Sequence, residues 1–545
     1  MPMGKNQVLK QEIAKVLACT PSARARSIID SPFTGQILEQ LPPQETYLII
    51  KESWGMDSQI LLQYVPPEAV CRFIDLDCWE KDTLSVEGVM EWLWEIYNAS
   101  FDTLAQALES IDLEIIVLLF QSYIEVVHVI PTDEHIPVLM DEGYESLDNN
   151  YFYRIILDDE KTPLVKEILS ILFTHHADLY YTVMGGVMFE LRSSMEEATY
   201  EKRSFRLMEM GFPPPDEAVS IYQHIRPEKL LDLGIRKEKT PVITKHLHML
   251  PAVYLDHFSQ KKDIIIQALD KANPEIQERF LYEMIYLANK IVMADFKPLN
   301  EMGEIKHSME KASSLTSLGL SVAMRKKGLS AEAILDTINA ETLFTLGYNM
   351  IYEQQRRLKL LLQEIESTML PENLREHVDG LLEKRPLYKG KDFSTIEELE
   401  EVKGFIDRME AMASIMSHIE WEDQIEYLSG TNTGASLDME TIILTSLAAL
   451  SIEKKARFRP LELHELLRFL SSTTHLEAGK RSMVPTFKDD LAAYLLAIDN
   501  SLEEAMARDI ASLLISRIED EISGIGNIEL LDPRFITCFT VKIPD

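Results

Sequence analysis

The charged segment from Glu190 to Arg206 holds the densest group of side chains that could bind a ligand or transfer protons. Glu190 and Arg192 come first, and Glu196, Tyr200 and Arg203 follow at three- or four-residue spacing. Such spacing places side chains on one face of a helix. The pattern predicts a polar groove for a ligand or a partner segment, or else a row of solvent-exposed ion pairs. It also supports an enzyme site assembled between helices as an alternative function.

A second candidate is a metal site. Glu125 and His128 form a Glu-x-x-His pair, which on a helix points both side chains the same way, as in di-iron helical bundles. No second pair completes such a set, so a polar pair on a mostly buried helix is the competing interpretation. The candidate ligands of a weak magnesium or calcium site are therefore Glu125 and His128 with the carboxylates Asp133, Glu134, Asp141 and Glu142. No other cofactor is expected.

Motifs for nucleophilic catalysis and phosphate binding are absent from the sequence. It contains no G-x-S-x-G, no P-loop, no G-x-G-x-x-G and no H-E-x-x-H. Its four cysteines are scattered, with no C-x-x-C pair, which is typical of a reducing compartment. We therefore assign no catalytic residue, and the chain is interpreted as a non-enzyme in preference to an enzyme.

Charge is unevenly distributed. Residues 1–160 hold 9 Lys and Arg against 28 Asp and Glu, a net charge of −19, while the remaining 385 residues carry −16 of the total of −35. Between Lys81 and Arg154 there are fifteen acidic residues and no basic one. Such a field repels nucleic acid and anionic membranes and attracts cations or basic proteins. A merely solubilising surface is the alternative interpretation.

The chain is expected to be cytoplasmic and not inserted in a membrane. Its first fifteen residues lack the apolar core of a secretory signal. The most apolar segment, Ile111–Ile130, contains five polar or ionisable residues, and charges at a bilayer centre cost roughly 2.5–3.5 kcal/mol each. A buried core helix is the better interpretation of that segment.

Apolar residues recur at helical spacing almost throughout, which predicts an all-α fold with longer helices packed beside stacks of short ones. One apolar stripe begins at Leu164 and continues to Met208 as a long helix, interrupted only by Gly185 and Gly186, which favour close packing or a kink. The exception is Phe535–Ile543, where a short strand is expected.

Proline pairs divide the N-terminal region into short units. Leu41-Pro42-Pro43 and Val65-Pro66-Pro67 each predict a helix start, because the first proline stops the preceding helix and the second suits the first helical position. Trp54-Gly55 marks a break between them, and a related proline pattern returns at residues 213–218 and 225–228. Short units of this kind must stack to bury their apolar faces, which predicts a solenoid-like architecture.

On these proline-led helix starts, residues 38–127 resemble the cytosolic N-terminal domain of MgtE-type magnesium transporters, a superhelix of short helices. The resemblance implies a stacked fold and suggests magnesium sensing. It does not imply transport, because neither the regulatory domain nor the transmembrane bundle of that family is recognisable. Taken whole, the chain also resembles an uncharacterised bacterial family of long helical cytoplasmic proteins, a domain of unknown function, most clearly over residues 203–222. Membership would imply no activity.

Three domains are predicted: residues 1–160 as an acidic helical-repeat domain, 161–300 as a middle helical domain, and 301–545 as a C-terminal helical domain. The function that fits best is a protein-interaction or regulatory module with a basic protein partner and no nucleic acid. The alternatives are the enzyme described above and a divalent-cation sensor that uses the acidic region. Homo-oligomerisation stays open.

Overall fold

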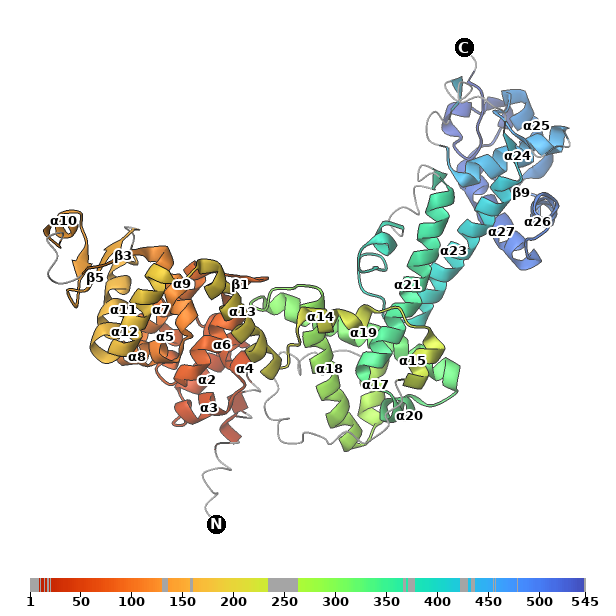
Figure 1. Cartoon of the computed structure of the whole chain (residues 1–545). Coiled ribbons are helices and arrows are strands. Elements are labelled where there is room, and N and C mark those ends of the chain that lie inside the picture. The colour runs from red at the N-terminus through yellow and green to blue at the C-terminus, as the bar shows by residue number, and fades with distance from the viewer. Residues whose placement is uncertain are drawn as a thin grey trace. The chain divides into compact units, whose positions relative to one another are not determined.

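The protein is described from a computed structural model over residues 9, 11–13, 15–16, 19, 21–129, 136–156, 160–233, 263–365, 369–370, 378–421, 430–432, 437–453, 455, 457–477 and 479–543. Helices make up most of these residues, and the strands are few and short (Figure 1), so the predicted all-α class is confirmed. The chain forms two compact units, Met1–Leu346 and Gly347–Asp545. The predicted domain boundaries near residues 160 and 300 stay predictions. No helix in the described part combines the length and apolarity needed to cross a bilayer.

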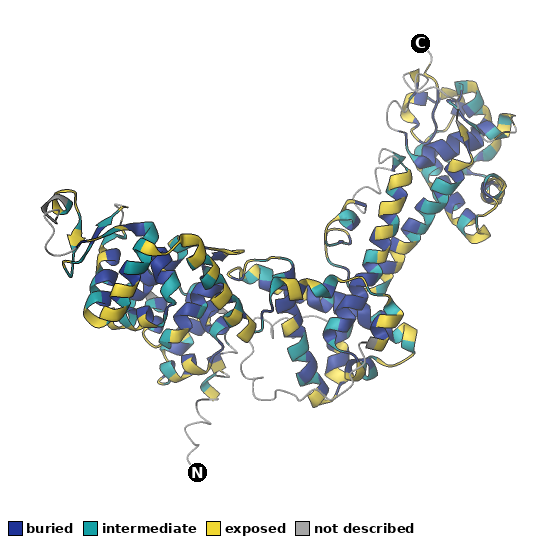
Figure 2. Cartoon of the chain, in the orientation of Figure 1, coloured by how far each residue is buried: buried dark blue, intermediate teal, exposed yellow. Residues whose placement is uncertain are grey.

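The first unit begins with a stack of short helices whose apolar faces pack together (Figure 2). These helices are α2 (Pro21–Ile29), α3 (Thr34–Gln40), α4 (Pro43–Glu52), α5 (Met56–Leu62), α6 (Pro67–Asp77), α7 (Val86–Ala99), α8 (Phe101–Ser110) and α9 (Leu113–Tyr123). Pro43 and Pro67 open α4 and α6, as predicted, because proline lacks only an N–H that the first turn leaves unused. Gly55 precedes α5 with φ of 112°, a conformation that favours glycine.

A small sheet interrupts the helices after α9. Strands β3 (Ile124–His128), β5 (Tyr151–Ile155) and β4 (Glu145–Ser146) pair antiparallel in that order, and α10 (Ile136–Asp141) lies between β3 and β4 in the chain. The prediction of one helix over Ile111–Ile130 is therefore right for α9 and wrong beyond Tyr123. β3 is rich in β-branched residues, and its backbone pairs with β5, whose partner residues lie 23 to 31 positions further along the chain.

Three helices replace the long helix predicted from Leu164 to Met208, so that prediction is wrong. They are α11 (Thr162–His175), α12 (Ala177–Phe189) and α13 (Arg192–Glu209). The chain leaves the helical conformation at His176 (ψ 55°) and again at Glu190 (ψ 139°). Gly186 allows α12 to approach α9: a Cβ there would lie 2.8 Å from Val117 Cγ2, which confirms the predicted close packing.

The rest of the first unit packs around two long helices, α18 (Pro274–Ala294) and α19 (Met302–Lys327). Shorter elements surround them: α14 (Pro215–Ala218), the 3-10 turn η1 (Val219–Tyr222), α15 (Pro227–Leu233), α17 (Ile264–Lys271) and α20 (Ala331–Thr337). Pro215 and Pro227 again occupy the first helical position. The second proline-rich region therefore builds helix starts in the same way as the first.

The division between the two units falls within α21 (Ala340–Glu364). The second unit is built mainly from five helices: α23 (Ile396–Ser417), α24 (Met439–Glu453), α25 (Leu463–Thr473), α26 (Phe487–Ile498) and α27 (Glu504–Ile522). Short strands β6 (Glu420–Trp421), β7 (Arg457–Phe458), β8 (Thr474–Glu477) and β9 (Lys480–Met483) connect them, and β1 (Trp79–Glu80) and β2 (Thr83–Leu84) form a hairpin in the first unit. The strand predicted at Phe535–Ile543 is reduced to isolated bridges at Val541 and Lys542.

Candidate functional site

Helix α13 carries most of the charged stripe that the sequence singles out, and it packs against α6 and α9. Its eighteen residues present two opposite faces. Thr199, Arg203 and Leu207 are buried on the inner face, whereas Glu197 and Glu201 are exposed on the outer face. The stripe is therefore not one continuous surface.

Arg206 is the centre of the inner face. Its Nε and Nη2 donate to the Oδ2 and Oδ1 of Asp75 at 2.5 and 2.9 Å, and its Nη1 lies 2.8 Å from Asp112 Oδ2. The Asp75 side chain is completely buried. Burial by itself lowers the pKa of Arg206, but its hydrogen bonds and charge attraction to Asp75 outweigh that effect and raise it. Arg206 thus holds α13 to α6 as a charged, two-pronged link.

Arg203 and Tyr200 fasten the β1–β2 hairpin. Arg203 Nε donates to the carbonyl oxygen of Asp75 at 3.0 Å, and its guanidinium lies 4.8 Å from the centre of the Trp79 ring. The Tyr200 ring is 6.1 Å from the same indole. Burial lowers the pKa of Arg203 to about 10, and attraction to Asp75 opposes that change. Both residues act as packing groups in this structure.

The other members of the stripe lie at the surface. Arg192 Nε donates to Glu196 at 2.9 Å, and Arg192 Nη1 donates to Ser122 Oγ at 2.9 Å. The side chain of Glu190 is exposed, and its carbonyl oxygen accepts a hydrogen bond from Gln121 Nε2 at 2.9 Å. The structure therefore separates Glu190, Arg192 and Glu196 from Tyr200 and Arg203. The ligand or partner groove predicted from all five stays a prediction.

The helical argument for a Glu125–His128 pair is wrong, because both residues lie in β3. Residues three apart in a strand point to opposite faces. Glu125 accepts hydrogen bonds from Arg154 and Tyr144, and the Arg154 hydrogen bond is the largest cause that lowers its pKa. The His128 ring packs 5.0 Å from Tyr151.

The remaining candidate metal ligands do not assemble within the described part of the chain. Asp141 and Glu142 are exposed at the end of α10, and Asp133 and Glu134 lie outside the described residues. Among the described residues no group of three His, Cys, Asp or Glu side chains could hold a metal ion. The magnesium or calcium site stays a prediction.

Sequence reasoning missed a buried carboxylate centre in the N-terminal stack. Asp77 accepts hydrogen bonds from Tyr47 Oη at 2.9 Å and from Lys51 Nζ and Trp92 Nε1, each at 2.7 Å. Lys51 Nζ also lies 4.7 Å from the Trp54 ring. Burial and the neighbouring Asp77 raise the pKa of Tyr47. No spacing signal could have found this centre, because its donors come from α4 and α7 and its acceptor from α6.

A second missed carboxylate, Glu95, supports the start of α5. It is buried on α7 and accepts from the Gly55 amide at 3.0 Å, from Ser58 Oγ and from Gln59 Nε2 at 3.3 Å. A carboxylate at this position satisfies backbone donors that a helix start leaves unpaired. Like Asp77, it serves the fold.

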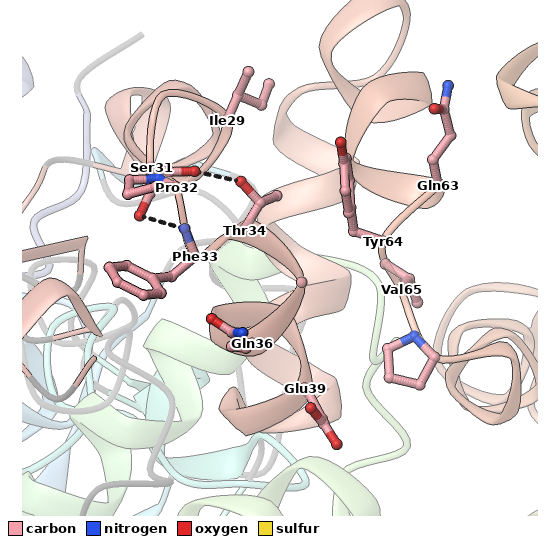
Figure 3. Close-up of a pocket in the computed structure, with 12 residues that line it drawn as sticks. Ile29, Ser31, Pro32, Phe33, Thr34, Gln36, Glu39, Gln63, Tyr64 and Val65 are labelled. Atoms are coloured by element: carbon pink, nitrogen blue, oxygen red, sulfur yellow. Dashed lines mark hydrogen bonds between the residues drawn. The ribbon is translucent and has the colours of Figure 1, made fainter. Parts of the chain in front are cut away.

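An open hollow of about 690 Å³ lies beside the α2–α3 turn (Figure 3). Phe33 and Tyr64 line it together with Pro32 and Pro66, and Glu39 is its only acidic residue. Thr34 Oγ1 donates to the Ser31 carbonyl oxygen at 2.8 Å and fixes the turn at its edge. None of the candidate ligand, partner or metal residues predicted from the sequence lines this hollow.

The segment between Lys81 and Arg154, which has fifteen acidic residues and no basic one, is called the acidic gap. Basic residues from Arg154 onward neutralise part of it. Lys166 pairs with Glu145 at 2.7 Å and Lys202 pairs with Glu114 at 2.6 Å. The links of Arg154 to Glu125 and of Arg206 to Asp112 act in the same way. Seven other carboxylates of this segment are exposed and make no ion pair with any described residue: Asp82, Glu87, Glu91, Asp102, Glu109, Asp141 and Glu142.

Comparison with known proteins supplies a family and no activity. No curated protein and no solved structure matches the chain significantly, and the resemblance of residues 38–127 to MgtE-type transporters is not confirmed. A family model described as a family of unknown function, DUF6178, matches residues 4–542. The match agrees with the resemblance to an uncharacterised family of long helical proteins. The chain belongs to this family of unknown function, DUF6178.

Proposed function

We propose that this chain is a protein-interaction module of the cytoplasm, with a scaffolding or regulatory role, and that its N-terminal helical stack binds a basic protein partner. The observation that carries the proposal is which carboxylates of the acidic gap form ion pairs and which stay exposed. Part of the gap is neutralised by basic residues of the chain itself. The proposed contact consists of five of the carboxylates that stay exposed, on the β1–β2 hairpin, α7 and α8: Asp82, Glu87, Glu91, Asp102 and Glu109.

Electrostatics favours a basic protein over the other classes of partner. Exposed charges of one sign steer association with opposite charge and reject like charge. Nucleic acid and anionic membranes carry the same sign as this surface. The conspicuous cations of α13, Arg203 and Arg206, are held in internal contacts, which leaves little positive charge there for an anionic ligand. A basic protein surface matches what the stack exposes.

The test is affinity capture from native cells followed by quantitative mass spectrometry. The test variant neutralises the five exposed carboxylates together as D82N, E87Q, E91Q, D102N and E109Q. The control neutralises five exposed acidic residues of the second unit: Glu397, Asp490, Glu503, Asp520 and Glu529. We expect a basic protein to be enriched by the wild type and by the control, and to fall about tenfold with the test variant. Equal enrichment by all three proteins would contradict the proposal.

A further inference from the structure

The outer face of α13 combines exposed apolar side chains with unpaired acidic ones. Glu197, Glu201, Phe205 and Met208 fall on one stripe of the helix, opposite the inner face that holds Arg203. Phe205 is 61% exposed and Met208 is 48% exposed. Neither Glu197 nor Glu201 makes an ion pair with a described residue, and Lys202 beside them is paired with Glu114.

Two more apolar side chains project at the N-terminal end of the same helix. Phe189, the last residue of α12, is 73% exposed, and Leu191, on the short link directly before α13, is 70% exposed. This link is anchored to α9 through Gln121, which donates to the Glu190 carbonyl, and through Ser122, which accepts from Arg192. The two side chains are therefore presented on a fixed backbone, which lowers the entropy cost of binding.

Exposed side chains from Phe189 to Met208 are thus apolar before and at the end of α13 and acidic in its middle, and the helix is about 27 Å long. Large exposed apolar side chains that gather on one element are typical of interaction sites. The two glutamates at the centre favour a partner that carries positive charge there. Glu197 and Glu201 are also like charges four residues apart, an arrangement that destabilises a helix. A cationic partner would remove that repulsion.

We propose that the outer face of α13, formed by Glu197, Glu201, Phe205 and Met208, binds a cationic amphipathic helix of the partner protein, with Phe189 and Leu191 contributing just before its N-terminal end. This inference rests on the proposed function and adds a second contact with the same partner, separate from the five carboxylates of the β1–β2 hairpin, α7 and α8. Apolar side chains of the partner helix contact the two ends of the face, and Lys or Arg residues in its middle contact Glu197 and Glu201.

Charge disfavours the other occupants of such a face. A second copy that docked through the same face would place Glu197 and Glu201 against their own equivalents. An anionic membrane would meet the same repulsion. A partner helix with central positive charge satisfies both the apolar ends and the acidic centre.

The experiment uses the full-length chain and two fluorescent synthetic peptides of about 20 residues, long enough to form a helix on binding. Both peptides carry the same apolar stripe; one has lysines and the other has glutamates at its central polar positions. Fluorescence anisotropy measures binding at about 50 mM and about 300 mM salt. We expect saturable binding of the lysine peptide that weakens with salt, and none of the glutamate peptide.

Matched variants locate the site. E197Q/E201Q should weaken binding of the lysine peptide about tenfold, and so should F205S/M208S. The control D520N/E529Q removes two exposed carboxylates of the second unit and should change binding less than about twofold. Circular dichroism confirms that each variant keeps its helix content.

Three results would overturn this assignment. One is the absence of saturable lysine-peptide binding. Another is equal weakening by D520N/E529Q, which would mean that the peptide responds to the overall negative charge of the protein, and which would leave the proposed function standing. The third is a dimer of the wild type, seen by analytical ultracentrifugation, that F205S/M208S abolishes, because the face would then belong to a second copy.

Discussion

At the scale of single residues, the charged groups of α13 divide between holding the fold together and facing solvent. Arg206 bonds to the buried Asp75, whereas Arg192 pairs with Glu196 at the surface. Both arginines stand out equally in the sequence. Spacing alone gives a helical face and does not tell which way that face points.

Arg206→Gln should therefore be far more damaging than Arg192→Gln. The first leaves Asp75 buried without its cation, which costs about 3–5 kcal/mol. The second breaks an exposed pair and should cost less than about 1 kcal/mol. Urea unfolding of the full chain followed by circular dichroism measures both. Equal midpoints for the two variants would show that the Arg206 link does not hold the fold.

A pH dependence follows from a carboxylate in the second unit. Arg459 donates to both oxygens of Glu465, each at 2.8 Å, and these bonds lower the pKa of Glu465 to about 2. Since this folded pKa lies below the ordinary value of 4.5, the pair stabilises the fold above about pH 4.5. That stability is lost as the pH falls toward 2.

Glu465→Gln should lower the stability at pH 7 by about 1.5–3 kcal/mol and flatten its decline between pH 4.5 and 2. Melting temperatures measured across this range provide the test. Glu477→Gln, at a side chain that is 84% exposed, is the control and should leave the curve unchanged. If the melting temperatures of the wild type and of Glu465→Gln fell in parallel between pH 4.5 and 2, the Arg459–Glu465 pair would not be the cause of the pH dependence.

At the scale of elements, the contact between α12 and α9 rests on one glycine. A Cβ at Gly186 would lie 2.8 Å from Val117 Cγ2, whereas a Cβ at Gly185 would lie 4.0 Å from its nearest neighbour, Tyr151 Oη. Gly186→Ala should destabilise the protein by about 1–3 kcal/mol through overpacking. Gly185→Ala should be neutral or stabilise by up to about 1 kcal/mol through helix propensity.

Thermal unfolding of the two alanine variants measures the difference. The double variant Gly186→Ala with Val117→Ala should recover part of the loss, because the smaller residue at 117 makes room for the new methyl group. If both single variants shift the melting temperature the same way, the close approach is not where the structure places it.

The proline-led helix starts give a second test at this scale. Pro43→Ala or Pro67→Ala should cost less than about 1 kcal/mol, because both residues occupy the first helical position. Leu61→Pro should cost about 3 kcal/mol or more, because Leu61 is fully buried within α5. Comparable losses of helical circular dichroism from both kinds of change would mean that the helix starts are misassigned.

These starts were predictable because proline acts locally, through its fixed φ and missing N–H. The helix breaks at His176 and Glu190 have no proline to mark them. The apolar stripe therefore predicted one helix where the structure has three. Strand β3 was missed for a related reason: its partner β5 lies far along the chain, and an apolar run gives no periodicity that separates strand from helix.

At the scale of the whole molecule, the acidic gap could be read from the sequence, but its neutralisation could not. The gap is defined by residues near one another in the chain. The cations that neutralise part of it, among them Lys166, Lys202 and Arg206, follow it and reach it only through folding. What stays exposed after that pairing sets the charge of the partner.

Hydrogen–deuterium exchange of the full-length chain, with and without a saturating amount of the lysine peptide, tests most directly whether the outer face of α13 binds the peptide. We expect exchange to slow in α13 and at the preceding residues Phe189 and Leu191, while exchange in α23–α27 of the second unit is unchanged. Protection that maps to the second unit, or none in α13 under saturating conditions, would contradict the claim that the outer face of α13 is the binding site.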